Sequence, residues 1–288
     1  MVIDYTQAIL LGLLQGITEL FPISSLGHSV ILPQLLGWDI HQEDPSFLTF
    51  LVATHTATAL VLLGVFWRDW VRIARGFARS IQRRRIGHLD PDARLAWLLI
   101  AGTIPAGLIG LAFESKLRGL FASPQLTAGA LFLNGLLLFG AELLRRRPRL
   151  EIAQQSDSDE RLAKLGWPQA FAVGIMQAIA LIPGFSRTGA ALAGGLLVGL
   201  SHEDAARYSF LLATPIIGAA SLLKLPTLLA PEAAPLRGPF LVGALCAGVA
   251  AFLAVQFLTR YFETNRLTPF AIYCMVVGIV SSLLLFMH

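Results

Sequence analysis

The sequence predicts an all-α polytopic membrane protein: an inverted-topology repeat with six transmembrane helices and two re-entrant helix pairs. Three observations lead to this fold class. Hydrophobic residues make up 55% of the 288 residues and charged residues only 14%, whereas roughly 25% of the residues of an ordinary soluble domain are charged. Six long apolar runs stand between polar loops, and two further apolar regions are broken in the middle. The composition argues against a cytosolic enzyme, a disordered protein and a disulfide scaffold.

Six apolar runs predict the membrane-spanning helices. At about 1.5 Å per residue, each is long enough, or nearly long enough, to cross the apolar core of a bilayer. The runs are Phe47–Trp67, Leu95–Phe113, Leu126–Leu144, Tyr208–Leu225, Phe240–Leu258 and Phe270–Met287.

Two further apolar regions, residues 2–36 and 167–200, are interrupted at Phe21–Ser25 and at Pro183–Thr188. Proline removes a helix hydrogen bond, and irregular backbone inside a membrane is tolerated only where protein or a water-filled cavity satisfies it. Each region is either two full spans or a re-entrant helix pair. The short second arms favour the re-entrant pair.

Basic residues predict the orientation. The loop at 68–94 carries eight arginines and the loop at 145–166 six lysines and arginines, whereas residues 114–122 between them carry two. By the positive-inside rule the first two loops are cytoplasmic and the third is outside. Region 167–200 then begins and ends inside, and region 1–36 begins and ends outside.

The two broken regions also resemble each other in sequence. At an offset of 162 residues they share seven identities, which include Gln15 with Gln177 and Ser24 with Ser186. With the opposite orientations, this predicts an inverted duplication, an architecture common in transporters. The predicted units are a first membrane repeat at 1–147, a mobile, polar cytoplasmic linker at 148–166 and a second membrane repeat at 167–288. Small residues such as Gly12 and Gly174 predict close helix contacts.

Polar residues gather at the first break. Gln15 and Glu19 lie one turn apart on one helix face, and Ser24, Ser25 and His28 follow. Ionisable groups inside a membrane are costly and usually functional. This set can supply a nucleophile, a base and a metal ligand, although Glu19 could also be paired with an arginine for packing alone.

The second break places Arg187 between the hydroxyls of Ser186 and Thr188, after Gly184. The guanidinium fork matches phosphate oxygens, and the helix N-terminus that follows favours an anion. If the two tips meet near the membrane midplane, they form an anion site. Arg207 is either an interfacial residue or a second phosphate contact. His55 either lines the cavity or makes an interhelical hydrogen bond.

Both breaks carry a resemblance to a known family. The signatures of the bacterial undecaprenyl pyrophosphate phosphatases, also called bacitracin-resistance proteins, are similar to QGITELFPISSLGH at 15–28 and to PGFSRTG at 183–189. The run AARYSFLLATP at 205–215 also matches. The resemblance covers essentially the whole chain.

The resemblance implies an enzyme that hydrolyses undecaprenyl pyrophosphate to undecaprenyl phosphate and inorganic phosphate, which recycles the lipid carrier of cell-wall synthesis. It implies catalytic roles for Glu19, Ser25, His28 and Arg187, with Glu19 also a candidate metal ligand. The six candidate substrate-binding residues are Gln15, Ser24, Gly184, Ser186, Thr188 and Arg207.

The sequence departs from the family pattern at two positions of the first signature. Gln15 stands where many members have glutamate, and Leu26 where a small hydroxyl residue is common. A second carboxylate is therefore missing, which puts its role as a metal ligand or base in doubt.

The remaining expectations concern ligands and location. A divalent cation, Mg²⁺ or Ca²⁺, is expected to assist a pyrophosphate substrate, and no organic cofactor is expected. The expected partners are the polyprenyl pyrophosphate lipid and the bacterial inner membrane, not nucleic acid, and a homodimer is left open. The alternative function is a transporter or flippase of a polyprenyl phosphate.

Overall fold

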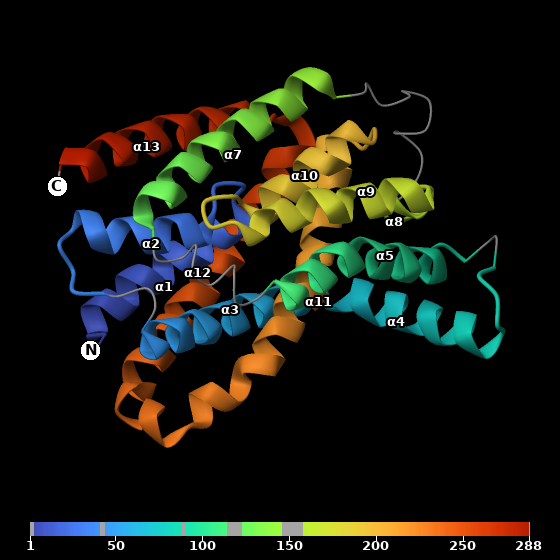
Figure 1. Cartoon of the computed structure of the whole chain (residues 1–288). Coiled ribbons are helices and arrows are strands. Elements are labelled where there is room, and N and C mark those ends of the chain that lie inside the picture. Colours follow the sequence, from blue (N-terminus) through green and yellow to red (C-terminus); the bar gives the residue numbers. More distant parts are fainter. Residues whose placement is uncertain (1–2, 41–43, 88–89, 114–122, 146–157, 288) are drawn as a thin grey trace.

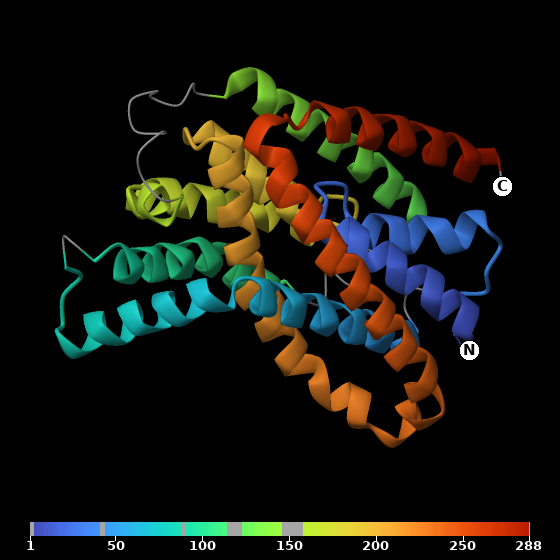
Figure 2. The same ribbon diagram turned by 180° about the vertical axis from the view of Figure 1, so that it is seen from behind.

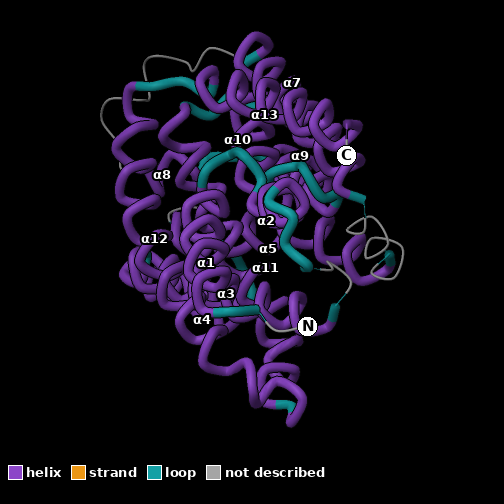
Figure 3. Tube along the Cα trace, turned by 90° about the vertical axis from the view of Figure 1, so that its left-hand side faces the viewer, coloured by secondary structure: helices purple, strands orange, loops and turns teal. Residues whose placement is uncertain are grey.

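The computed structural model describes residues 3–40, 44–87, 90–113, 123–145 and 158–287. Within these ranges the regular structure consists of helices (Figures 1 and 3). The α-helices are α1 (Tyr5–Leu20), α2 (Ser25–Leu35), α3 (Pro45–Val65), α4 (Trp67–Gln82), α5 (Pro91–Ala112), α7 (Pro124–Leu144), α8 (Ser158–Ala163), α9 (Trp167–Ala178), α10 (Arg187–Leu197), α11 (His202–Leu229), α12 (Arg237–Thr264) and α13 (Thr268–Met287). Two short 3₁₀ helices are η1 (Ile179–Leu181) and η2 (Pro231–Leu236).

Six segments of the described chain are long and apolar enough to cross a membrane, which confirms the number predicted from the apolar runs. They are Pro45–Val65, Pro91–Ala112, Pro124–Leu144, His202–Leu229, Ala233–Thr264 and Thr268–Met287. Each contains the core of one predicted run, and several extend it at one or both ends. The fourth begins earlier than predicted because Ser201 caps α11 by accepting a hydrogen bond from the amide of Asp204.

Two helical hairpins lie tip to tip at the centre of the molecule. The chain turns between α1 and α2 at Phe21–Ser24, and between α9 and α10 at residues 182–186, so the predicted breaks are confirmed. In Figure 1 the two hairpins approach each other from opposite sides of the molecule. The re-entrant passage of these hairpins and the inverted duplication remain predictions.

Glycines allow the first arm of each hairpin to pack closely on a long helix. A Cβ atom at Gly12 in α1 would overlap the backbone oxygen of Gly243 in α12, and one at Gly174 in α9 would overlap that of Gly102 in α5. Figure 2 shows α12 running alongside α1. This close packing was predicted from the small residues and fixes the direction from which each tip reaches the centre.

The linker proposed at 148–166 is described only from residue 158. There the chain forms α8, which is docked on α11 rather than mobile, because the Ser158 hydroxyl donates to Asp204 at 2.6 Å and Arg161 binds the same carboxylate at 2.8 Å. These contacts hold α8 against the N-terminal end of α11.

Candidate active site

The two tips present two helix N-termini to one pocket. Ser24 is the N-cap of α2 and accepts from the amide of Gly27, and Ser186 is the N-cap of α10 and accepts from the amide of Gly189. The first turns of both helices carry backbone N–H groups without an intrahelical acceptor. The pocket is lined by Glu19, Ser24, Ser25, Leu26, Ala180, Phe185, Ser186 and Arg187. Two helix N-termini at one pocket favour an anion.

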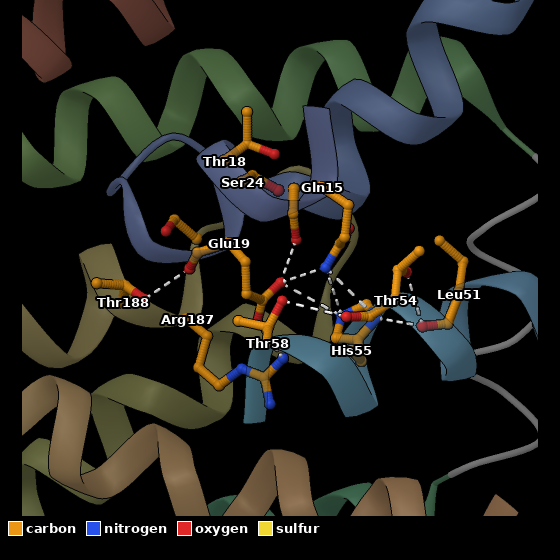
Figure 4. Close-up of polar contacts among 12 residues, drawn as sticks. Gln15, Thr18, Glu19, Ser24, Leu51, Thr54, His55, Thr58, Arg187 and Thr188 are labelled. Carbon is orange, nitrogen blue, oxygen red and sulfur yellow. Dashed lines mark hydrogen bonds and ion pairs between the residues drawn. The ribbon is translucent and has the colours of Figure 1, made fainter. Parts of the chain in front are cut away.

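The carboxylate of Glu19 lines this pocket and is almost fully buried, with 4% of its side chain exposed. One oxygen, Oε1, is bound by Nη2 of Arg187 at 2.9 Å. The other, Oε2, accepts hydrogen bonds from the hydroxyl of Ser25 and from Nε2 of Gln15, the latter at 3.0 Å. Figure 4 shows the carboxylate between Arg187 on one side and Gln15 on the other. The two oxygens therefore have different partners. Oε1 faces a cation, and Oε2 accepts from a hydroxyl and an amide.

A histidine from α3 completes the surroundings of the carboxylate. Nε2 of His55 lies 3.3 Å from Oε2 of Glu19 and 3.2 Å from Nε2 of Gln15. Its other ring nitrogen, Nδ1, lies 2.7 Å from the backbone oxygen of Leu51 (Figure 4). His55 therefore contacts the site. The sequence analysis could not decide whether it lines the cavity or makes an interhelical hydrogen bond. The signal that it could be functional was its position as the only titratable side chain of an apolar run.

Hydrogen bonds between the tips fix their relative position. The Thr188 hydroxyl donates to the backbone oxygen of Glu19 at 2.9 Å, and the Ser186 hydroxyl donates to that of Phe21 at 3.3 Å. Asn134 of α7 contacts both tips: its Nδ2 donates to the oxygen of Pro22 at 3.0 Å, and its Oδ1 accepts from the amide of Ser186 at 3.1 Å. The tips therefore meet, which the sequence analysis had posed only as a condition for an anion site, and Asn134 was not anticipated.

Three of the four predicted catalytic residues, Glu19, Ser25 and Arg187, are brought together by the tips. His28 is not. It lies further along α2, where Nδ1 is 2.7 Å from the oxygen of Ser24 and Nε2 is 2.9 Å from the hydroxyl of Tyr273. Its ring stacks on that of Tyr273, with 5.7 Å between the centroids. In this arrangement His28 supports the tip of α2 and does not line the pocket.

Some of the predicted substrate-binding residues line the pocket, and the others lie around it or away from it. Ser24 and Ser186 line the pocket, although both hydroxyls cap helices. Gln15 is fully buried and its amide contacts Glu19 and His55, so it supports the carboxylate. The hydroxyl of Thr188 contacts backbone.

Gly184 packs against α7, and Arg207 forms ion pairs with two carboxylates. Gly184 has a φ of +102°, and a Cβ atom there would overlap the backbone oxygen of Thr127, so glycine is required for the turn to pack on α7. Arg207 does not line the pocket: its guanidinium binds Asp69 at 3.1 Å and Asp159 at 2.8 Å, on the side of the molecule formed by α4 and α8. The sequence did not predict that Arg207 pairs with two carboxylates.

Comparison with known proteins identifies the family of the chain. The family model described as bacitracin resistance protein BacA matches residues 8–280. The chain belongs to this family. BacA-family relatives named undecaprenyl-diphosphatase include one from Mycolicibacterium paratuberculosis, 48% identical over 96% of this chain and 95% of its own length. Another, named undecaprenyl-diphosphatase 2, from Frankia alni, is 42% identical over 96% of both chains.

The BacA-family site has the parts that phosphoryl transfer requires. A hydroxyl contacts a carboxylate that can accept its proton, and an arginine beside them can bind phosphate oxygens through a planar fork. Two helix N-termini add partial positive charge without a counter-ion of their own. The arrangement suits a ligand with an anionic phosphate end.

Proposed function

We propose that this chain is an undecaprenyl-diphosphatase, which hydrolyses undecaprenyl pyrophosphate to undecaprenyl phosphate and inorganic phosphate. The relatives that carry this name match it over nearly their whole length. The activity recycles the lipid carrier of cell-wall synthesis and accounts for the family's link to bacitracin resistance. A multi-pass membrane protein suits this substrate because its long prenyl chain stays in the bilayer.

The single observation that carries the proposal is the contact between Ser25 and Glu19 at a pocket that also holds Arg187. A serine hydroxyl is a weak nucleophile until a base accepts its proton. Here the base is already in hydrogen-bond contact, and its second oxygen is held by the arginine. Catalysis of phosphoryl transfer depends on such positioning and on positive charge around the equatorial oxygens.

The reaction follows from these contacts. The terminal phosphate of the substrate binds at the two helix N-termini, and the remaining N–H groups of Arg187 bind its oxygens. Ser25 Oγ attacks the terminal phosphorus as its proton moves to Glu19 Oε2. The bond from phosphorus to the bridging oxygen breaks, and undecaprenyl phosphate leaves with the electron pair. Water then hydrolyses the phosphoserine, and Ser25 Oγ regains a proton from Glu19.

The alternative mechanism is direct attack of water on the terminal phosphorus, with Glu19 as the base.

The described residues do not fit a resident divalent cation. Mg²⁺ and Ca²⁺ need several oxygen ligands, whereas Glu19 is the carboxylate at this pocket and Arg187 already neutralises it. No group of three metal-binding side chains occurs in the described part of the chain. Any divalent cation would be carried by the phosphates of the substrate, and no step of the reaction is assigned to it here.

We further infer the location and topology from the sequence pattern. The chain resides in the bacterial inner membrane, with the basic loops in the cytoplasm and the hairpins α1–α2 and α9–α10 entering from opposite faces. In that arrangement the pocket lies near the midplane, and residues 1–147 and 167–288 form two inverted repeats.

The decisive experiment is an assay for phosphate release from undecaprenyl pyrophosphate by the purified protein in detergent. An enzyme releases phosphate without a second compartment, whereas a transporter or flippase releases none. The site favours the enzyme because a transporter has no need of a serine in contact with a base. Absence of phosphate release by the folded protein would refute the proposal.

A further inference from the structure

Asn134 lies outside the set of residues that line the pocket, yet it is hydrogen-bonded to both tips. It is at the middle of α7, ten residues from Pro124 and ten from Leu144, or about 15 Å from each end at 1.5 Å per residue. The side chain is fully buried. An amide at this depth is costly unless its hydrogen-bonding groups have partners, and the partners of Asn134 indicate its role.

Two backbone groups fix the orientation of this amide. A backbone N–H only donates, so the amide of Ser186 must face Oδ1 of Asn134, at 3.1 Å. A backbone carbonyl only accepts, so the oxygen of Pro22 must face Nδ2, at 3.0 Å. Nδ2 also donates to Sγ of Cys274 in α13, at 3.3 Å. The reversed amide would turn a donor toward one tip's donor and an acceptor toward the other tip's acceptor, so one orientation satisfies both tips.

The two backbone groups that Asn134 binds lie beside the reacting side chains. Ser186 directly precedes Arg187. Pro22 lies in the turn of the other hairpin, midway along the chain between Glu19 and Ser25. A shift of either tip therefore moves the guanidinium relative to the carboxylate and the hydroxyl. Since α7 packs on both α2 and α10, a side chain of α7 can hold the two tips in one register.

We propose that Asn134 is a positioning residue that holds Arg187 in register with the nucleophile Ser25. It acts through the backbone of the two tips and not on the substrate. Phosphoryl transfer depends on this kind of alignment between the nucleophile and the positive charge around the phosphate. The inference rests on the proposed function, because the register matters for turnover only if the serine attacks a phosphate that the arginine binds.

Removal of the amide has a definite consequence for both tips. The N–H of Ser186 loses this acceptor and the oxygen of Pro22 loses this donor, and both residues are buried. Buried groups without a partner are costly, so each tip relaxes by itself. The hydrogen bonds of Thr188 and Ser186 to the first tip remain. The pocket therefore keeps its lining, whereas the alignment needed for the chemical step is lost.

The first test compares Asn134→Leu with the matched control Thr127→Val, with thermal unfolding of each variant in parallel. Asn134→Leu should lower kcat about 10–100-fold, because a misplacement of about 1 Å can cost 10²-fold in rate. KM should change little, because the substrate contacts are retained. Thr127 is also fully buried on α7, and its hydroxyl has no hydrogen-bond partner in the described part of the chain, so Thr127→Val should match the wild type. Wild-type kcat in folded Asn134→Leu, or an equal loss in Thr127→Val, would overturn the proposal.

The second variant, Asn134→Asp, does not depend on the folding of a leucine variant. A protonated carboxyl has the shape of the amide, and it can accept from the N–H of Ser186 while its hydroxyl donates to the oxygen of Pro22. An ionised carboxylate has no donor for Pro22. The kcat of Asn134→Asp, relative to the wild type, should therefore be highest at the acidic end of the pH range and fall as the carboxyl ionises. A kcat that stays well below the wild type by the same factor at every pH would overturn the proposal.

A double-mutant cycle tests whether Asn134 acts through the register of the arginine. Because the position of the second tip matters less once its guanidinium is gone, Asn134→Leu should slow an Arg187→Ala variant much less than it slows the wild type. Independent, multiplying losses would show a general effect on the fold and would overturn the proposal. An inactive wild type would instead overturn the proposed function and this role with it. An active wild type with an unaffected Asn134→Leu variant overturns only the role of Asn134.

Discussion

Replacement of Arg187 by lysine separates the catalytic and structural contributions of this residue. Arg187 is the first residue of α10, and its Nη2 atom binds Oε1 of Glu19 at 2.9 Å. With 24% of its side chain exposed, at the pocket, the guanidinium has further N–H groups for a phosphate. A lysine ammonium can still face Glu19, but it cannot bind the carboxylate and two phosphate oxygens with a fixed planar geometry.

The expected losses differ between activity and stability. Loss of one well-placed donor to a developing oxyanion typically lowers kcat by about 10²–10³, or about 3–4 kcal/mol of activation free energy, and this is the loss expected for Arg187→Lys. Its free energy of unfolding should change by less than about 1 kcal/mol, because a cation still faces Glu19. Arg187→Ala leaves a buried carboxylate without its cation and should cost about 1–3 kcal/mol of stability, an estimate below that for a fully buried pair because Arg187 is partly exposed to solvent.

The assay measures phosphate release from undecaprenyl pyrophosphate in detergent, with thermal unfolding of each variant in parallel. The matched control is Arg207→Lys, the same exchange at an arginine that binds Asp69 and Asp159 and does not line the pocket. Arg207→Lys should retain kcat within about 3-fold of the wild type, since Arg207 does not line the pocket and a lysine ammonium can still face Asp159.

Two results would refute the reasoning about Arg187. One is near-normal kcat in a folded Arg187→Lys or Arg187→Ala variant, which would remove the residue from the reaction. The other is an equal loss in Arg207→Lys, which would show that the arginine fork matters for the fold and not for the phosphate.

Three further predictions concern the nucleophile, His28 and the topology. Ser25→Ala should lower kcat about 10³-fold or more and abolish a phosphoserine trapped by acid quench and detected by mass spectrometry; a phosphate burst without phosphoserine in the wild type would favour water as the nucleophile. His28→Gln, which keeps hydrogen-bonding groups near Tyr273, should reduce kcat less than Ser25→Ala, and equal losses would contradict a supporting role. In a cysteine-free background, Gln82→Cys should be labelled only from the cytoplasm and Ser123→Cys only from outside; labelling of both from one side would contradict the span count.

The sequence by itself determined the membrane character, the six spans and the two breaks. These are local properties. The length of an apolar run sets whether it can cross a bilayer, and proline beside glycine or serine inside an apolar run favours a turn there. The same local chemistry identified Glu19, Ser25 and Arg187, because ionisable and hydroxyl groups are conspicuous in apolar surroundings.

Only the tertiary structure decided which of these groups meet. Glu19 and Arg187 are 168 residues apart in the chain, and the packing of the two hairpins brings them to 2.9 Å. The same packing turns His28 toward Tyr273 and His55 toward Glu19. Spacing along a helix tells which residues share a face, but the partner of that face depends on how helices from distant parts of the chain cross. That crossing is set by contacts such as the one between Gly12 and Gly243. The small residue at position 12 indicates a close contact but does not give its partner.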